Sequence, residues 1–279
     1  MINESTIPSI TQSHIPSLGS FLSGTPERIL AATKTPKVLI AWLHGDEPLG
    51  AHVARHIYSE RPDLTAHVDY LCGNPRAAGS VPAKGFCESD LNRSFDFTRP
   101  AQTYEQKRAV EIAELAKRYD YVLDIHNAVD PAQGKSLIVP HAHLHKAAIR
   151  DLIAASPIKR IIVMEPAPVA RSLIGTAPNA ITVEYSFEDS KKHGVADVVR
   201  LLENLAIGRA HTPTEREFYY VEGTIPKTQD PGPSARNFEF YEPGGYYPII
   251  LGTGPRSYRE DPTKDYCCFY ATRREIVKL

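Results

Sequence analysis

The feature that most constrains the fold is an uninterrupted apolar run early in the chain, Val38 to Leu43 (VLIAWL). A run without polar alternation suits a strand covered on both faces, so residues 37–43 are predicted to form a buried central strand. Because predicted strands and helices alternate, we expect an α/β fold, with a mainly parallel, mixed sheet and helices on both faces. The other strands are predicted at 66–72, 121–125, 136–139, 160–164 and 180–185, and the helices at 48–59, 103–118, 144–155 and 195–206.

The amino-acid composition of the chain changes near Gly208. Residues 213–262 are rich in proline, glycine and aromatic side chains, as in EPGGYYPIILGTGP, and show no helical period. Such a pattern predicts a small β-rich region. We therefore expect two domains, a catalytic domain at 1–207 and a β-rich C-terminal domain at 208–279 that shapes the channel to the site.

Composition excludes several classes of partner. The formal net charge is −1 and charged residues make up 23% of the chain, so no bulk charge favours nucleic acid or an anionic membrane. The apolar run is too short to span a bilayer, and the N-terminus lacks the pattern of a signal peptide. The four cysteines show no CxxC spacing, and two of them are vicinal, which favours a reducing, cytoplasmic setting over a disulfide framework.

Two imidazoles and a carboxylate stand where predicted strands end. His44 and Glu47 lie in LHGDE after the first strand, and His126 lies in LDIHN after a later one. Open α/β sheets bind ligands at the carboxyl ends of their strands, and two histidines with one carboxylate form a catalytic zinc site. Asp124 could fix the tautomer of His126, although it could equally be a solvated strand-end charge. An HxxE pair by itself is a weak signal.

Two other histidine patterns compete with this one. His52 and His56 share a helix face in HVARH, but Val53 stands where a helical zinc-protease motif needs its glutamate, so an ordinary helix face is expected. The alternating histidines of PHAHLH, at 141–145, follow a proline and precede a helical stretch. We expect them to lie in a solvated loop.

Two basic motifs lie between the candidate ligands. GNPRA contains Arg76, and SDLNRSF contains Asn92 and Arg93. A guanidinium held by a rigid turn can bind a carboxylate or a developing oxyanion. Either arginine alone is equally well explained as a surface residue paired with a nearby acid.

Taken together, the motifs HGDE, NPRA, DLNR, DIHN and VEYS over residues 38–190 resemble the succinylglutamate desuccinylase/aspartoacylase family, relatives of the zinc carboxypeptidases. The resemblance implies one zinc ion per chain and a zinc carboxypeptidase-like fold with a C-terminal β domain that narrows the channel. It also implies the site residues: His44, Glu47 and His126 as zinc ligands, Glu184 as the catalytic glutamate, Arg76 as the carbonyl-polarising arginine, Asn92 and Arg93 as the carboxylate clamp, and Tyr258, or less well Tyr266, as the tyrosine from the C-terminal domain.

The chain departs from the family pattern in three places. Trp42-Leu43 replaces small residues before the first histidine, and Tyr185-Ser186-Phe187 follows the glutamate in place of Val-Gly-Pro. Arg171 resembles the arginine that holds a second substrate carboxylate, but its spacing to Glu184 is longer and Ala167 stands where a tyrosine is usual.

The function implied by the resemblance is zinc-dependent hydrolysis of the amide of an N-acyl amino acid, with Glu184 as general base and then acid. The partner is then a small N-acyl amino acid. Two alternatives stay open: a carboxypeptidase-like metallopeptidase acting on peptides, and a metal-free ligand-binding relative. The acyl group, the amino acid and the oligomeric state, a homo-oligomer included, are also open.

Overall fold

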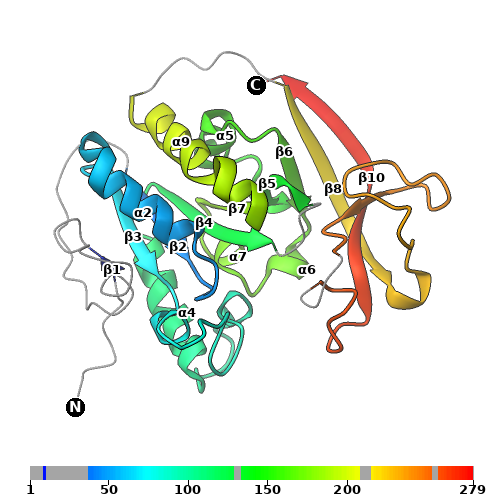
Figure 1. Ribbon diagram of the computed structural model, residues 1–279, viewed down its shortest axis with the longest axis horizontal. Helices are drawn as coiled ribbons and strands as arrows, with labels where there is room; N and C mark the ends of the chain where they lie inside the picture. Colours follow the sequence, from blue (N-terminus) through cyan, green and yellow to red (C-terminus); the bar gives the residue numbers. More distant parts are fainter. Residues whose placement is uncertain (1–8, 11–36, 129–132, 208–214, 253–256, 279) are drawn as a thin grey trace.

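The computed structural model describes residues 9–10, 37–128, 133–207, 215–252 and 257–278. Within these residues one sheet of ten strands runs through the molecule, in the order β1-β3-β2-β4-β7-β5-β6-β8-β10-β9 (Figure 1). The strands are β1 (Ser9–Ile10), β2 (Val38–Trp42), β3 (Val68–Cys72), β4 (Tyr121–Ala128), β5 (Lys135–Pro140), β6 (Arg160–Met164), β7 (Ala180–Ser186), β8 (Glu215–Pro226), β9 (Tyr247–Ile249) and β10 (Tyr266–Lys278).

The sheet is mixed, and its central part is mainly parallel. Strand β2 pairs in parallel with β3 and β4, β4 with β7, β5 with β6, and β6 with β8. The antiparallel pairs are β5 with β7, β1 with β3, and the C-terminal pairs of β10 with β8 and β9. The predicted fold class is therefore confirmed.

Helices cover both faces of the sheet (Figure 1). Side chains from α2, α5 and α9 share one hydrophobic core with the sheet, and side chains from α4 and α7 share a second. The α-helices are α2 (Leu49–Glu60), α3 (Pro75–Ala78), α4 (Tyr104–Ala116), α5 (Ala147–Ala155), α6 (Pro166–Val169), α7 (Leu173–Thr176), α8 (Phe187–Asp189) and α9 (Val195–Ile207). Short 3-10 helices η1 (Pro62–Leu64), η2 (Leu91–Arg93), η4 (His141–His143) and η6 (Lys227–Gln229) and the π-helix η5 (Ser190–Gly194) complete the elements.

The apolar run at β2 is buried because both faces of this strand are covered, as its sequence predicts. Ile40 and Trp42 belong to the core under α2 and α9, whereas Ala41 and Leu43 belong to the core on the other face. Each of these side chains is at most 1% exposed. Successive side chains of a strand point to opposite faces, so only a strand covered on both sides requires apolar residues at every position.

The C-terminal strands continue the central sheet. β8 pairs with β6 at 217–220 and then extends beyond it as a long antiparallel ribbon with β10 (Figure 1). The ribbon has a small core of its own around Ile225, Tyr246 and Leu251. The proposed domain boundary falls at 207/208, beside residues 208–214, which lie outside the described part of the chain. The division into two domains thus remains a prediction.

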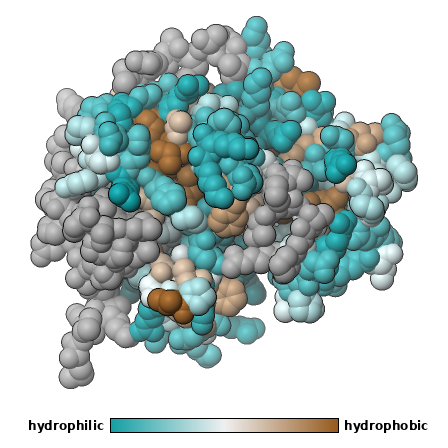
Figure 2. Space-filling view, viewed as in Figure 1, coloured by the Kyte–Doolittle hydropathy of each residue, from teal (hydrophilic) through white to brown (hydrophobic). Residues whose placement is uncertain are grey.

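On the face shown in Figure 2, the described side chains are mostly hydrophilic, with apolar side chains scattered among them. Across the described residues, no helix is both long and apolar enough to cross a bilayer. Cys72, Cys87, Cys267 and Cys268 are all free thiols.

A buried carboxylate in α4 anchors the loop that leads to η2. The helix begins with the predicted capping box of Thr103 and Gln106. In its first turn Glu105, fully buried, accepts hydrogen bonds from the backbone amides of Cys87 (2.7 Å), Glu88 and Ser89. It also accepts one from Asn74 Nδ2 at 3.0 Å. The carboxylate therefore holds the 87–89 loop against the helix and places η2.

Replacing Glu105 by alanine should destabilise the protein strongly, because the amide groups of the 87–89 loop and Asn74 lose their common acceptor. We expect a loss of about 3 kcal/mol or more in the free energy of unfolding, measured by urea denaturation. Glu114→Ala is the matched control, since Glu114 lies on the same helix, is 63% exposed and pairs with the equally exposed Lys117. It should change stability by less than about 0.5 kcal/mol. Equal losses in the two variants would contradict the anchoring role.

Candidate active site

The turn after β2 carries the first two candidate ligands. His44 and Glu47 face each other across a turn in which the Glu47 amide donates to the His44 carbonyl at 3.3 Å. Gly45 is required in this turn, because a Cβ atom there would lie 2.2 Å from the backbone nitrogen of Ala78 in α3. Asn127 ties the turn to β4, since its Oδ1 accepts from the Leu49 amide that opens α2. Backbone packing therefore determines where the two side chains point.

Parallel pairing brings the remaining residues to the same edge of the sheet. β4 lies between β2 and β7, and His126 on β4 stands directly opposite Glu184 on β7. Asp124 and Thr182 occupy the preceding opposed positions on the same face of these two strands. The candidate ligands and the glutamate thus come from neighbouring strands and converge at their carboxyl ends, where open α/β sheets place ligands.

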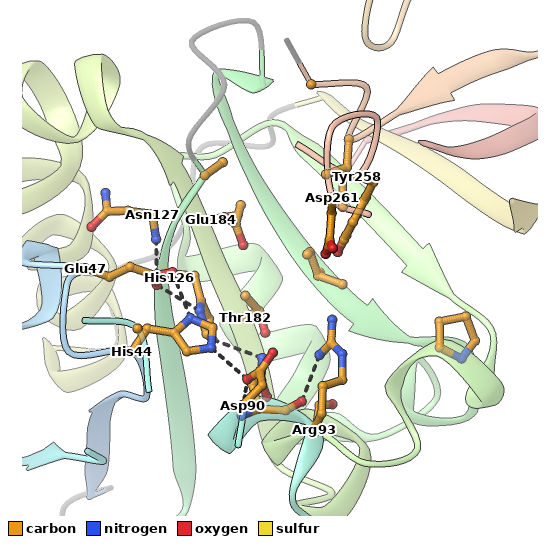
Figure 3. Close-up of a pocket in the computed structure, with 18 of the residues that line it drawn as sticks. His44, Glu47, Asp90, Arg93, His126, Asn127, Thr182, Glu184, Tyr258 and Asp261 are labelled. Carbon is orange, nitrogen blue, oxygen red and sulfur yellow. Dashed lines mark hydrogen bonds and ion pairs between the residues drawn. The ribbon is translucent and has the colours of Figure 1, made fainter. Parts of the chain in front are cut away.

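Three side chains form a potential metal site (Figure 3). One oxygen of Glu47 lies 2.8 Å from His44 Nδ1, and the other lies 3.0 Å from His126 Nδ1. The second oxygen also accepts from the Asn127 backbone amide at 3.0 Å. Three potential ligand atoms, one each from His44, Glu47 and His126, all lie within 4.8 Å of one another. The predicted ligand set therefore comes together in space.

The other imidazole nitrogens face carboxylates. His44 Nε2 lies 2.9 Å from Asp90 Oδ1, and His126 Nε2 lies 3.0 Å from Asp124 Oδ1. For His44 the carboxylate favours the tautomer with a proton on Nε2, which leaves the Nδ1 lone pair for a metal, whereas Nε2 of His126 faces both Asp124 and the amide nitrogen of Asn92. Both Nδ1 atoms are the ones directed at Glu47. This donor set fits a metal ion bound through two Nδ1 atoms and a carboxylate.

Electrostatics at the cluster favour a positive charge. Burial alone would lower the pKa of His44, but the charge of Glu47 and the hydrogen bond to Asp90 raise it to about 10. His126 behaves in the same way: despite burial, Asp124 and Glu47 raise its pKa well above its ordinary value. Burial acts to raise the pKa of Glu47, yet the two imidazoles lower it overall. A site that holds protons this strongly is also suited to a cation.

Glu184 differs from the other carboxylates of the cluster. Burial is the main cause that raises its pKa to about 7, and the negative charges of Glu47 and Asp124 add to the shift. The imidazoles act in the opposite direction. A carboxyl group with a pKa near neutrality can both accept and donate a proton under physiological conditions.

The cluster opens into a cavity of about 630 Å³, and Arg93 and Tyr258 line its opposite side. Arg93 Nη1 donates to the Asn92 carbonyl at 2.8 Å, and the side chain of Tyr258 hydrogen-bonds to Arg93. Tyr258 and Asp261 point together toward Arg93 in Figure 3. The Asn92 side chain lies 3.2 Å from His126 Nε2 and also accepts from the Leu173 amide, so it connects the metal cluster to α7.

Two arginines predicted to serve the site do not line the cavity among the residues that the structure describes. The guanidinium of Arg76 lies over the Tyr104 ring, 4.2 Å from its centroid. Arg171 is 66% exposed and pairs with Asp96 at 3.1 Å. The roles predicted for these two arginines remain predictions. Val169 and Ser172, neighbours of Arg171 in sequence, do line the cavity.

The competing histidines also lie away from the cavity. His52 is exposed and His56 is half-buried on α2, and His141 in η4 pairs with Glu165 at 3.1 Å. The solvated 141–145 segment is confirmed, although its first residues form a 3-10 turn. Tyr266 packs against Tyr258, with ring centroids 5.1 Å apart, and does not join the cavity lining.

The residues that line the cavity and that sequence reasoning missed include Asp90, Thr182, Asp261 and Lys264. The position of Asp90 offered a signal, since it directly precedes the Leu91-Asn92-Arg93 segment and could have been weighed as Asp124 was. Thr182 could have been found from its place two residues before Glu184 on the same strand face. No local pattern identifies Asp261 and Lys264, which reach the cavity only through the return of the C-terminal loop.

Comparison with known proteins agrees with the motifs. Residues 34–187 match the family model of the succinylglutamate desuccinylase/aspartoacylase catalytic domain. The chain belongs to this family. No curated protein sequence matches the chain.

Solved structures of relatives show the same fold at low identity. Murine aminoacylase 3 is 19% identical, with 89% of this chain and 99% of that chain covered and a TM-score of 0.63. Succinylglutamate desuccinylase from Chromobacterium violaceum is 16% identical, with 96% and 99% covered and a TM-score of 0.69. The enzyme from Vibrio parahaemolyticus is 16% identical, with 90% and 87% covered and a TM-score of 0.65.

The raised pKa of Glu184 predicts a pH-dependent effect on stability. Between the ordinary carboxyl pKa of 4.5 and the raised pKa of about 7, the folded state holds a proton that the unfolded state has released, so the group destabilises the fold as pH rises through this window. Glu184→Gln removes this effect. In chelator-treated protein, the variant should melt at a higher temperature than the wild type at pH 8, and the difference should vanish near pH 4. A variant that melts at or below the wild-type temperature at pH 8 would contradict the burial argument.

Proposed function

We propose that the protein is a zinc-dependent hydrolase that cleaves the amide bond of N-acyl amino acids, releasing a carboxylate and a free amino acid. The observation that carries this proposal is the convergence, in one cavity, of the His44–Glu47–His126 cluster with Glu184. Membership of the succinylglutamate desuccinylase/aspartoacylase family supports it. The names of the structural relatives, a desuccinylase and an aminoacylase, point to acylated amino acids as substrates of those proteins.

His44, Glu47 and His126 would hold the zinc ion. Two imidazole nitrogens and one carboxylate form the ligand set of catalytic zinc sites, which keep a further position for water or substrate. A bound zinc ion supplies a Lewis acid that makes water a nucleophile near neutral pH. Asp90 and Asp124 would orient the two imidazoles through their Nε2 atoms.

Glu184 would transfer the proton. Its carboxylate accepts a proton from the attacking water and then passes it to the nitrogen of the leaving amino acid. A pKa near 7 suits this double role, because neither protonation state is strongly disfavoured. We assign no step to Arg76, whose guanidinium lies over the Tyr104 ring in this structure.

Arg93 and Tyr258 would bind the carboxylate of the substrate, with Asn92 supporting Arg93. The guanidinium offers paired donors to a carboxylate, and the Tyr258 hydroxyl lies beside it. This clamp stands across the cavity from the metal cluster (Figure 3). An N-acyl amino acid has its free carboxylate two bonds from the amide nitrogen, so the clamp would set the scissile bond near Glu184 and the cluster.

The C-terminal loop favours small substrates over peptides. Residues Ser257, Tyr258, Asp261, Pro262, Thr263 and Lys264 line the cavity together with residues of the central sheet. A cavity of about 630 Å³ lies within the usual range for small-molecule sites. These observations support an acyl amino acid rather than a long peptide. We also propose that 208–279 acts as the channel-shaping domain and that the protein is cytoplasmic, in keeping with its four free thiols.

Exchanging Glu184 for glutamine should separate chemistry from metal binding. We expect zinc content near one ion per chain, measured by mass spectrometry, while turnover of an N-acetyl amino acid falls about 10²-fold or more because the proton acceptor is lost. Glu47→Gln is the comparison: it should lose zinc as well as activity. Full turnover in Glu184→Gln would remove the role assigned to this residue, and zinc near zero in the wild type would overturn the metal proposal.

Arginine substitutions test the assignment of the clamp. Arg93→Ala should lower kcat/KM by about 10- to 100-fold, because a charge-assisted hydrogen bond to the substrate is worth about 1.5–3 kcal/mol. Arg171→Ala should change kcat/KM by less than about threefold, since its guanidinium pairs with Asp96 on the surface. Steady-state kinetics with one substrate decide between them. A large effect at Arg171 with a small one at Arg93 would reverse the assignment.

A further inference from the structure

One wall of the cavity is apolar and continuous with a hydrophobic core. Ile138, Met164, Val169, Ile174 and Phe269 all line the cavity and all belong to the core cluster on the α4/α7 face of the sheet. Each is at most 8% exposed. These side chains come from β5, β6, α6, α7 and β10, so the wall is assembled from five separate elements.

The wall stands directly beside the carboxylate clamp. The Phe269 ring packs edge-on against Tyr258, with centroids 5.7 Å apart. An amino acid whose carboxylate binds Arg93 and Tyr258 has its side chain only one carbon away from that carboxylate. The wall is therefore the surface that the amino acid's side chain would meet.

Among the described residues, no arginine or lysine side chain belongs to this wall. Arg171 turns away to Asp96 on the surface, and Arg93 is taken by the first carboxylate. Hydrogen bonds from Thr263 are the main cause that lowers the pKa of Asp261. The positive charge of the nearby Lys264 lowers it further. An acidic side chain would thus be buried against apolar groups without a partner, which is costly.

The polar side chains in the same region are already engaged. Thr182 Oγ1 lies 3.5 Å from Asp124 Oδ2, and Ser172 Oγ donates to the Val169 carbonyl at 2.7 Å. The Gly175 amide donates to the same Ser172 oxygen. Neither hydroxyl is therefore available as a free donor to a carboxylate.

Ile250 adds an independent sign that the wall is functional. It lines the cavity with φ at 58°, a left-handed conformation that is unfavourable for a β-branched residue. Residues held in such conformations cluster at ligand sites, because the surrounding structure maintains them for the position of the side chain. Glycine would adopt this conformation without strain, but it would remove the apolar side chain from the cavity.

We propose that the site takes N-acyl derivatives of amino acids with apolar side chains, aliphatic or aromatic, rather than of aspartate or glutamate. The inference rests on the proposed function. It follows from an apolar wall beside the clamp and from the outward direction of Arg171.

Kinetics of the zinc-loaded enzyme with four substrates test the proposal: N-acetyl-leucine, N-acetyl-phenylalanine, N-acetyl-aspartate and N-acetyl-glutamate. We expect kcat/KM to be at least tenfold higher for the first two. A preference for the acidic pair would overturn the inference and leave the proposed function intact. If none is hydrolysed, the proposed function fails, and calorimetric binding of N-acetyl-leucine and N-acetyl-aspartate to zinc-loaded Glu184→Gln decides the inference. Tighter binding of N-acetyl-leucine supports it; equal, weaker or absent binding overturns it.

A charge placed in the wall should reverse the preference. Val169→Lys should lower the ratio of kcat/KM for N-acetyl-leucine over N-acetyl-aspartate at least tenfold. Val110→Lys is the matched control, because Val110 is 43% exposed on α4 and is not in the cavity lining; it should leave the ratio unchanged. An unchanged ratio in folded Val169→Lys would count against the wall.

A second variant covers the case in which Val169→Lys does not fold. Ile250→Gly relieves backbone strain, so its melting temperature should equal or exceed that of the wild type, while kcat/KM for N-acetyl-leucine falls at least tenfold. A purely structural role for Ile250 would not produce that combination. Unchanged kinetics in Ile250→Gly would overturn the part assigned to this residue and, with it, the inference.

Discussion

The site depends on one carboxylate. Glu47 contacts His44 with one oxygen, and His126 and the Asn127 amide with the other. These contacts join the turn after β2 to the end of β4, and the parallel pairing of β4 with β7 then places Glu184 beside them. A buried carboxylate held between two imidazoles needs a compensating positive charge, as protons or as a metal ion. The geometry and the electrostatics of the cavity therefore share the same cause.

Around this centre, the protein uses buried carboxylates for different tasks. Glu105 accepts backbone amides and holds the loop before η2 in place. Asp90 and Asp124 face the outer nitrogens of the two histidines. Among the residues that the structure describes, no comparable set of donors faces Glu184, and burial raises its pKa to about 7. The same functional group is thus a structural anchor, an orienting partner or a proton carrier according to the donors around it.

The fold and the metal cluster were predictable because their signals are local or repeated. Successive side chains of β2 enter the cores on opposite faces of the sheet. The continuous apolar run therefore indicated a central strand. His44 follows this strand and His126 lies near the end of β4, and parallel pairing of neighbouring strands brings their carboxyl ends together. The substrate side was less predictable. Arg76 and Arg171 stand in recognisable motifs, but Tyr104 and Asp96 provide alternative partners that no motif reveals.

By itself, the sequence determined the strand and helix alternation, the family and the residues able to bind a metal, because periodicity and short motifs encode these features. Only the tertiary structure decided which way long side chains turn and what the far wall of the cavity consists of. The wall joins side chains from β5 to β10, and Tyr258, Asp261 and Lys264 arrive on a loop distant from the other motifs. Such contacts depend on packing between elements far apart in the chain. That packing is also what gives the cavity its apolar side.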